Sequence, residues 1–222
     1  MWETDRRSAS SERTTETQRH RADDSTRVPA CSSTLSLCVS VVGFSQQSRS
    51  LPCLPTVKAD KVYLVGFMAA GKTTLARALA RRLDWRAVDI DELIEQREHA
   101  PVAEIFAKHG EAYFRAVERE VLADQLAPRH VVVATGGGTF ADPQNRAAIN
   151  GDGVSVWLDV PLERLIARVP ADGRRPLAAD RAGFEHLYHQ RRAAYELAHK
   201  RLDAGRAGVD ALVEQLVDWL ER

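Results

Sequence analysis

The chain has 222 residues, of which 44% are hydrophobic, so it is long enough to bury a substantial core. Its 31 Lys and Arg residues balance 31 Asp and Glu residues, which argues against an extended basic surface for a nucleic-acid backbone. No apolar run reaches the roughly 18 to 20 residues that a transmembrane helix needs, so we expect a soluble protein that binds any anion locally.

Residues 1–57 differ in composition from the rest of the chain. They are rich in Ser, Thr, Arg and Gln, and their only sustained apolar run is short, at residues 35–44. This composition is typical of a disordered extension. Acidic residues scattered through residues 3–24 argue against a transit peptide. An alternative is that residues 1–57 are upstream sequence and that the true start lies near Val57.

All three cysteines, Cys31, Cys38 and Cys53, lie in this first part of the chain. Residues 58–222 therefore contain neither a disulfide framework nor a cysteine metal site. This usage suits a reducing compartment, and we expect a cytoplasmic protein.

From Lys58 onward, apolar runs alternate with helical periodicity. The expected strands are 62–65, 86–91, 131–135, 154–160 and 201–204. The expected helices are 73–83, 91–98, 102–108, 111–126, 143–150, 161–169, 182–200 and 208–221. Strands that alternate with helices pair in parallel through right-handed crossovers, so we expect one α/β domain at 58–222, a three-layer α/β/α sandwich.

A phosphate-binding loop follows the first strand. Residues 66–74, GFMAAGKTT, satisfy the pattern G-x-x-x-x-G-K-[ST] between a strand and a helix. The glycines let backbone N–H groups point at phosphate oxygens beside a helix N-terminus. Lys72 is expected to reach the β- and γ-phosphates and Thr73 to ligate Mg²⁺. The candidate ATP-phosphate ligands are Gly66, Ala69, Ala70, Gly71, Lys72, Thr73 and Thr74.

Two aspartates end the second expected strand. The strand at 131–135 ends in Thr135 and Gly136, so it lacks the carboxylate that often supports magnesium in P-loop proteins. Asp89 and Asp91 are the natural substitutes, and alternation along a strand predicts that they share a face. The alternative is that Asp91 only caps the helix that begins there.

With these motifs in place, residues 58–222 resemble the shikimate kinases. The motifs that carry the resemblance, all in the family's order, are Asp89 and Asp91, GEAYFR at 110–115, the triple glycine Gly136, Gly137 and Gly138, Arg-Pro-Leu at 175–177, and Arg191 with Tyr195. The resemblance implies a monomeric P-loop kinase fold with strand order 2-3-1-4-5 and a mobile lid. It also implies ATP-dependent phosphorylation of the 3-hydroxyl of shikimate, giving shikimate 3-phosphate and ADP, a step towards chorismate and the aromatic amino acids.

The resemblance also assigns roles in the acceptor site. Arg115 and Arg191 would hold the carboxylate of shikimate, since guanidinium groups are planar and bidentate donors. Gly136, Gly137 and Gly138 would offer N–H groups without a Cβ. Asp91 would bind the ring hydroxyls and act as the base. Glu118, one helical turn after Arg115, either orients that arginine or forms an ordinary surface ion pair.

The segment 169–180 contains helix-breaking residues and two adjacent cations. We expect it to close over bound substrates and exclude water, and to bring Arg175 to the transferring phosphoryl group, with Arg174 as the alternative. Together with Lys72 and Asp91, Arg175 completes the expected catalytic set. Mg²⁺ would be held by Thr73 directly and by Asp89 through water.

Other interpretations remain open. The resemblance places adenine between Arg168 and the loop that carries Arg206, which lacks the proline common in the family. A gluconate- or nucleotide-kinase-like enzyme would keep the loop and lid without needing Arg115, the glycines and Arg191 together. A sensing module on the same fold would call for an attached DNA-binding region, and residues 1–57 show no paired helical pattern.

Overall fold

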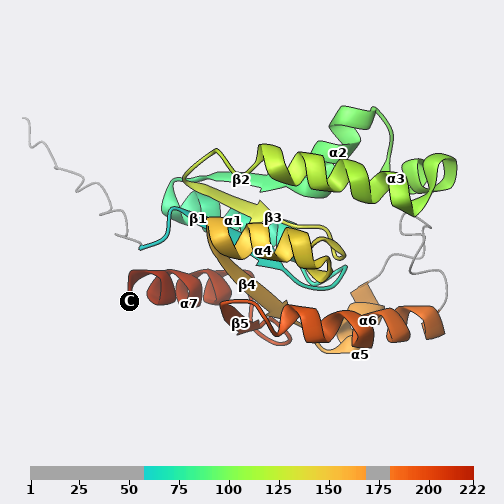
Figure 1. The fold of residues 1–222 in the computed structure, drawn as a ribbon. Coiled ribbons are helices and arrows are strands. Elements are labelled where there is room, and N and C mark those ends of the chain that lie inside the picture. Colours follow the sequence, from blue (N-terminus) through green and yellow to red (C-terminus); the bar gives the residue numbers. More distant parts are fainter. Residues whose placement is uncertain (1–57, 169–180) are drawn as a thin grey trace, which may run out of the picture. The chain divides into compact units, whose positions relative to one another are not determined.

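The structure is a computed structural model that describes residues 58–168 and 181–222 (Figure 1). The expectations for residues 1–57 lie outside the described residues. So do those for the segment 169–180, including the roles of Arg174 and Arg175.

Five parallel strands form one sheet at the centre of the described domain. The strands are β1 (Lys61–Val65), β2 (Arg86–Asp89), β3 (Val131–Ala134), β4 (Val154–Asp159) and β5 (Lys200–Asp203). Their order is β2-β3-β1-β4-β5, which confirms the expected parallel sheet and its topology. The central strands β1 and β3 are buried along their whole length, as expected for a parallel sheet covered on both faces.

Helices cover both faces of this sheet (Figure 1). They are α1 (Lys72–Leu83), α2 (Ile90–Glu98), α3 (Val102–Asp124), the 3-10 helix η1 (Thr139–Ala141), α4 (Pro143–Asp152), α5 (Leu162–Arg168), α6 (Arg181–Tyr195) and α7 (Val209–Glu221). The apolar stripe of α1, Leu75, Leu79 and Leu83, is buried, and α1 packs beside α7. The three-layer α/β/α architecture is therefore confirmed.

One helix ends well before its expected boundary. The helix expected at 182–200 ends at Tyr195, because Asn150 binds the carbonyl of Leu197 and His199 accepts a hydrogen bond from the Ser155 backbone. These contacts from distant parts of the chain hold a turn that local periodicity does not reveal. The two helices expected at 102–108 and 111–126 are confirmed as the two parts of α3, which is broken at Gly110, where φ is 80° and ψ is 173°.

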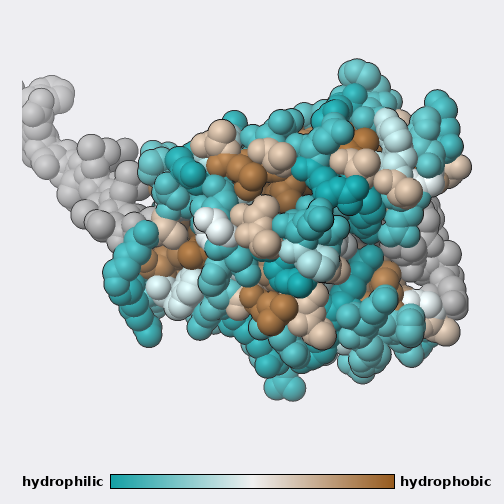
Figure 2. Space-filling view, viewed as in Figure 1, coloured by the Kyte–Doolittle hydropathy of each residue, from teal (hydrophilic) through white to brown (hydrophobic). Residues whose placement is uncertain are grey.

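The hydrophobic residues of the described domain lie mainly between the sheet and its helices. The large hydrophobic side chains that remain exposed there are Tyr113 and Leu197. Figure 2 shows hydrophilic residues over most of one face, with hydrophobic residues in small separate groups. Among the described residues, no helix has the length and hydropathy to cross a membrane.

A buried polar cluster lies at the amino end of β1. The Lys61 side chain is fully buried, and its Nζ donates to the carbonyls of Gln125 and Leu126 at 2.8 Å each and to Asp152 Oδ2 at 2.6 Å. Tyr63 donates to the same carboxylate oxygen at 2.5 Å. Lys61 thus ties the first strand to the end of α3 and to α4, far along the sheet from the strand ends that carry the site.

Candidate active site

A cavity of about 440 Å³ lies at the carboxyl ends of the strands. Ligands of open α/β sheets bind at this end, where loops follow the strands. Its polar lining comes from Thr73, Asp89, Asp91, Glu92, Glu95, Arg115, Glu118, Gly136, Gly137, Gly138 and Arg191. The structure thus brings all of the expected acceptor and metal residues into one cavity.

The phosphate loop connects β1 to α1 at the edge of this cavity. Gly66, Ala69 and Gly71 have φ values of 139°, 60° and 96°, so the loop curls tightly before α1 begins. Buried Lys72 donates its Nζ to the carbonyls of Gly66 and Phe67, at 3.0 and 2.8 Å. The loop therefore offers a lysine and a helix N-terminus at one place, which is the arrangement that binds phosphate.

The geometry of Asp89 and Asp91 corrects the expectation of a shared strand face. Strand β2 ends at Asp89, and Asp91 lies in the first turn of α2. Asp89 caps this helix by accepting from the N–H groups of Asp91 and Glu92, at 2.9 and 3.4 Å. A capping aspartate satisfies N–H groups that have no partner within the helix, so the strand ends early. The alternative, in which Asp91 is the cap, is also wrong, yet both carboxylates line the cavity.

Asp89 also contacts the phosphate loop. Its second oxygen, Oδ2, accepts a hydrogen bond of 2.5 Å from the Thr73 hydroxyl. A hydroxyl and a carboxylate thus lie side by side at the cavity. These are hard oxygen donors, the kind that Mg²⁺ prefers.

Arg115 on α3 is held by two carboxylates. Its Nη1 donates to Glu118 Oε2 at 2.8 Å, and its Nη2 donates to Glu111 Oε1 at 3.1 Å. Burial alone would lower the pKa of Arg115, but the carboxylates of Glu118 and Glu111 outweigh it and raise that pKa. Because Glu118 has 0% of its surface exposed, its pair with Arg115 is no ordinary surface ion pair.

The triple glycine lets side chains approach the main chain closely. A Cβ on Gly138 would lie 2.5 Å from Nη2 of Arg115. A Cβ on Gly136 would lie 2.7 Å from Glu118 Oε1 and 2.8 Å from Asp91 Oδ1. Any larger residue would push these functional groups aside, so the glycines have a specific role in the geometry of the cavity.

Helix α6 supplies the second arginine of the cavity. Arg191 is 7% exposed, and its guanidinium carbon lies 5.9 Å from the centre of the Phe67 ring. Burial lowers the pKa of Arg191, and the positive charge of Arg115 acts in the same direction. One turn later, Tyr195 donates its hydroxyl to the carbonyl of Gly137. Two guanidinium groups in one partly buried cavity favour a ligand that brings negative charge.

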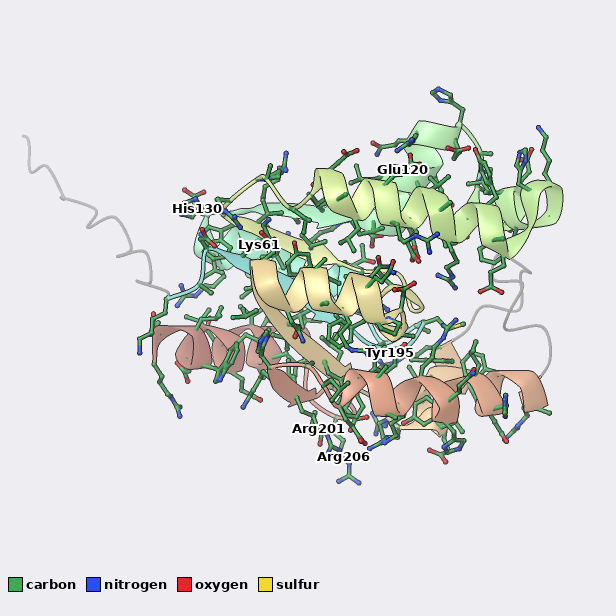
Figure 3. The ribbon with its side chains drawn as sticks, in the orientation of Figure 1. Lys61, Glu120, His130, Tyr195, Arg201 and Arg206 are labelled. Atoms are coloured by element: carbon green, nitrogen blue, oxygen red, sulfur yellow. The ribbon has the colours of Figure 1, made fainter. Side chains whose placement is uncertain are left out.

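The residues expected around adenine lie elsewhere. Arg168 ends α5 and Arg206 follows β5, and both side chains are exposed. Neither lines the cavity, and Figure 3 shows Arg206 extending away from the domain. Their roles stay predictions.

Sequence reasoning missed several residues of the site. Phe106 and Phe114 form an apolar wall of the cavity, and the usable signal was the place of Phe114 in the GEAYFR motif directly before Arg115. Thr139 directly follows the triple glycine and bonds to Glu118, but nothing in its local sequence distinguishes it.

The fold defines a P-loop kinase, with a cavity beside its phosphate loop that contains two arginines. A family model described as shikimate kinase matches residues 68–221, and the chain belongs to this family. Among curated relatives, the shikimate kinase of Persephonella marina is 39% identical over 142 residues, covering 64% of this chain and 87% of the relative. That of Sulfurihydrogenibium sp. is 36% identical over 162 residues, covering 72% and 98%.

Solved structures agree with this assignment. The shikimate kinase from Acinetobacter baumannii in complex with shikimate has a TM-score of 0.68 and 33% identity, covering 75% of this chain and 93% of that one. A deoxyadenosine kinase from M. mycoides with bound dATP has a TM-score of 0.52 at 14% identity, covering 73% of this chain and all of that one. This second likeness shows the fold alone. The gluconate- or nucleotide-kinase interpretation gains no support from these findings.

Proposed function

We propose that the chain transfers the γ-phosphoryl group of ATP to the 3-hydroxyl of shikimate, forming shikimate 3-phosphate and ADP on the route to chorismate. The observation that carries this proposal is the convergence of Arg115, Arg191 and the glycines 136–138 in one cavity beside a phosphate loop. The A. baumannii relative, whose structure contains shikimate, supports this choice of acceptor.

The acceptor site matches an acid that carries a ring. Arg115 and Arg191 supply planar donors to a carboxylate, and Glu118 fixes the plane of Arg115. Phe106 and Phe114 supply an apolar wall for the carbon ring. The rival interpretations do not require this combination of groups.

We assign Asp91 to the acceptor hydroxyl. It lines the cavity in the first turn of α2, two residues after Asp89, which accepts a hydrogen bond from Thr73 of the phosphate loop. As the hydroxyl attacks the γ-phosphorus, the Asp91 carboxylate accepts its proton. Lys72 exchanges its loop carbonyls for phosphate oxygens when ATP binds. We also assign Arg175 to the transferring phosphoryl group, a role that lies outside the described residues.

The pair formed by Thr73 and Asp89 fits a magnesium ion. In the described part of the chain, no three His, Cys, Asp or Glu side chains gather as a metal site. Mg²⁺ in kinases needs few protein ligands because water and phosphate oxygens complete its shell. When bound, Mg²⁺ neutralises charge on the β- and γ-phosphates. We propose that the Thr73 hydroxyl ligates the ion directly and that Asp89 holds one of its waters.

The wider setting is also proposed. We place the catalytic domain at residues 58–222 and regard residues 1–57 as an extension outside it. We further propose that the protein acts as a cytoplasmic monomer on shikimate and ATP alone.

ADP release by the full chain tests the proposed reaction. With ATP and Mg²⁺, we expect turnover on shikimate and none above background on quinate, gluconate or nucleoside monophosphates, with loss of activity when EDTA removes Mg²⁺. Turnover on gluconate or a nucleoside monophosphate, without turnover on shikimate, would show that shikimate is not the acceptor. The same assay on residues 58–222 measures whether residues 1–57 are dispensable.

A further inference from the structure

Thr139 occupies a place that the proposed function does not use. It begins η1 directly after the triple glycine and has 0% of its surface exposed. Its hydroxyl donates a hydrogen bond of 2.6 Å to Glu118 Oε1. Because Glu118 also binds Arg115, this hydrogen bond connects Thr139 to the acceptor site.

The two oxygens of Glu118 are divided between two partners. Oε1 accepts from Thr139, and Oε2 accepts from Arg115 Nη1 at 2.8 Å. The terminal torsion of a glutamate is broad, so one hydrogen bond leaves the plane of its carboxylate poorly fixed. A second donor on the other oxygen fixes this plane, and with it the direction in which Arg115 is held.

The carboxylate of Asp91 lies close to that of Glu118, so the hydrogen bond from Thr139 to Glu118 matters more. Glu118 Oε1, Asp91 Oδ1 and Thr139 Oγ1 all approach Gly136, at 2.7, 2.8 and 3.0 Å from the position that a Cβ would occupy there. Two carboxylate groups in so small a space repel each other whenever both carry charge. The Thr139 hydroxyl is a donor at this crowded point, and it opposes movement of the Glu118 carboxylate away from Asp91.

We propose that Thr139 is a positioning residue for the acceptor: through Glu118, its hydroxyl sets the orientation in which Arg115 meets the carboxylate of shikimate. The inference rests on the proposed function, in which Arg115 binds that carboxylate. It predicts that the hydroxyl of residue 139 matters for acceptor affinity, whereas its methyl group does not.

Two substitutions separate the hydroxyl from the shape of the side chain. Thr139→Val keeps the volume and removes the donor, whereas Thr139→Ser keeps the donor. Because hydrogen bonds to charged groups are among the stronger ones and this one acts indirectly, we expect Thr139→Val to raise the KM for shikimate by about 5- to 30-fold. Its KM for ATP should stay within about twofold and its kcat within about threefold, and Thr139→Ser should resemble the wild type. Thr139→Ala also lacks the hydroxyl and gives the same test if the valine variant folds poorly.

A double-mutant cycle tests whether Thr139 acts through Arg115. Direct binding of shikimate is measured by calorimetry for Thr139→Val, for Arg115→Met and for the double variant. If the inference is correct, Thr139→Val weakens binding in the wild-type background and adds less than about twofold in the Arg115→Met background.

Three results would overturn the inference while leaving the proposed function intact. These are an unchanged KM for shikimate in Thr139→Val, equal losses for shikimate and ATP that Thr139→Ser does not rescue, and an undiminished effect in the Arg115→Met background. Failure of the proposed function would appear separately, because the wild-type chain itself would then neither bind nor phosphorylate shikimate.

Discussion

Substitution of Arg191 by Met should separate acceptor binding from stability. Arg191 is 7% exposed, and methionine can replace its aliphatic stem against Phe67 while removing the charge. The loss of one partner from a buried, hydrogen-bonded charge pair costs roughly 2 to 5 kcal/mol. At about 1.4 kcal/mol per factor of ten, this range corresponds to a factor of roughly 30 to several thousand. Because Arg115 remains in the cavity, we expect an effect in the lower part of this range, which is a rise of about 30- to 300-fold in the KM for shikimate.

Arg191→Met weakens acceptor binding, but it should increase the stability of the unliganded protein. The lowered pKa of Arg191 means that folding disfavours its charged form, first because of burial and further because of Arg115. At neutral pH the charged side chain therefore reduces stability, and Arg191→Met relieves this cost. A gain of about 1 kcal/mol corresponds to a rise of about 2 to 4 °C in the melting temperature of a domain of this size.

Initial rates at saturating ATP and thermal unfolding without ligands measure the two effects. Arg191→Lys serves as the matched control, because it keeps the charge and loses the bidentate fork. It should show a smaller rise in the KM for shikimate and no gain in melting temperature. A KM for shikimate within threefold of wild type in Arg191→Met, or an equal loss for ATP, would refute the assignment of Arg191 to the acceptor carboxylate.

Three further substitutions test other parts of the structure. Lys61→Met removes the ammonium donor from half-buried Asp152 and from the carbonyls of Gln125 and Leu126, while Asp152 keeps its bonds to Arg129 and Tyr63. Urea denaturation should show a loss of about 1 to 3 kcal/mol with KM values unchanged; a loss below about 0.5 kcal/mol would mean that the Lys61 hydrogen bonds are not formed. Ala69→Gly relieves a left-handed φ of 60°, and because glycine also gains freedom in the unfolded chain, thermal unfolding should show a net stabilisation of about 0 to 1 kcal/mol, contradicted by any clear destabilisation. Tyr195→Phe removes the donor to the Gly137 carbonyl, and steady-state kinetics should show a KM for shikimate raised by about 3- to 10-fold with the KM for ATP unchanged; equal effects on both substrates would contradict a local role.

The phosphate loop and the sheet could be read from the sequence because their signals are local. The loop motif specifies a backbone path, and the structure shows that path in the φ values of Gly66 and Gly71. The apolar runs of β1 and β3 mark strands buried on both faces. The strand order came from family resemblance, since local patterns do not determine which strands are neighbours.

The detailed geometry of the site was harder to predict from the sequence. Asp89 was expected to continue a strand, but its capping of α2 depends on where the chain turns, which alternation of apolar residues does not encode. Thr139 was missed because its partner, Glu118, lies 21 positions away and the contact forms only in the folded domain. The end of α6 likewise depends on contacts of Asn150 and Ser155 with the turn that follows.

Identification of the reaction product by NMR tests the central claim most directly. The full chain is incubated with ATP, Mg²⁺ and shikimate, and the ³¹P and ¹H spectra locate any new phosphate ester on the ring. We expect one phosphate monoester, at the 3-hydroxyl, formed in equal amount to ADP. An ester at another hydroxyl, or ADP accompanied only by free phosphate, would contradict it.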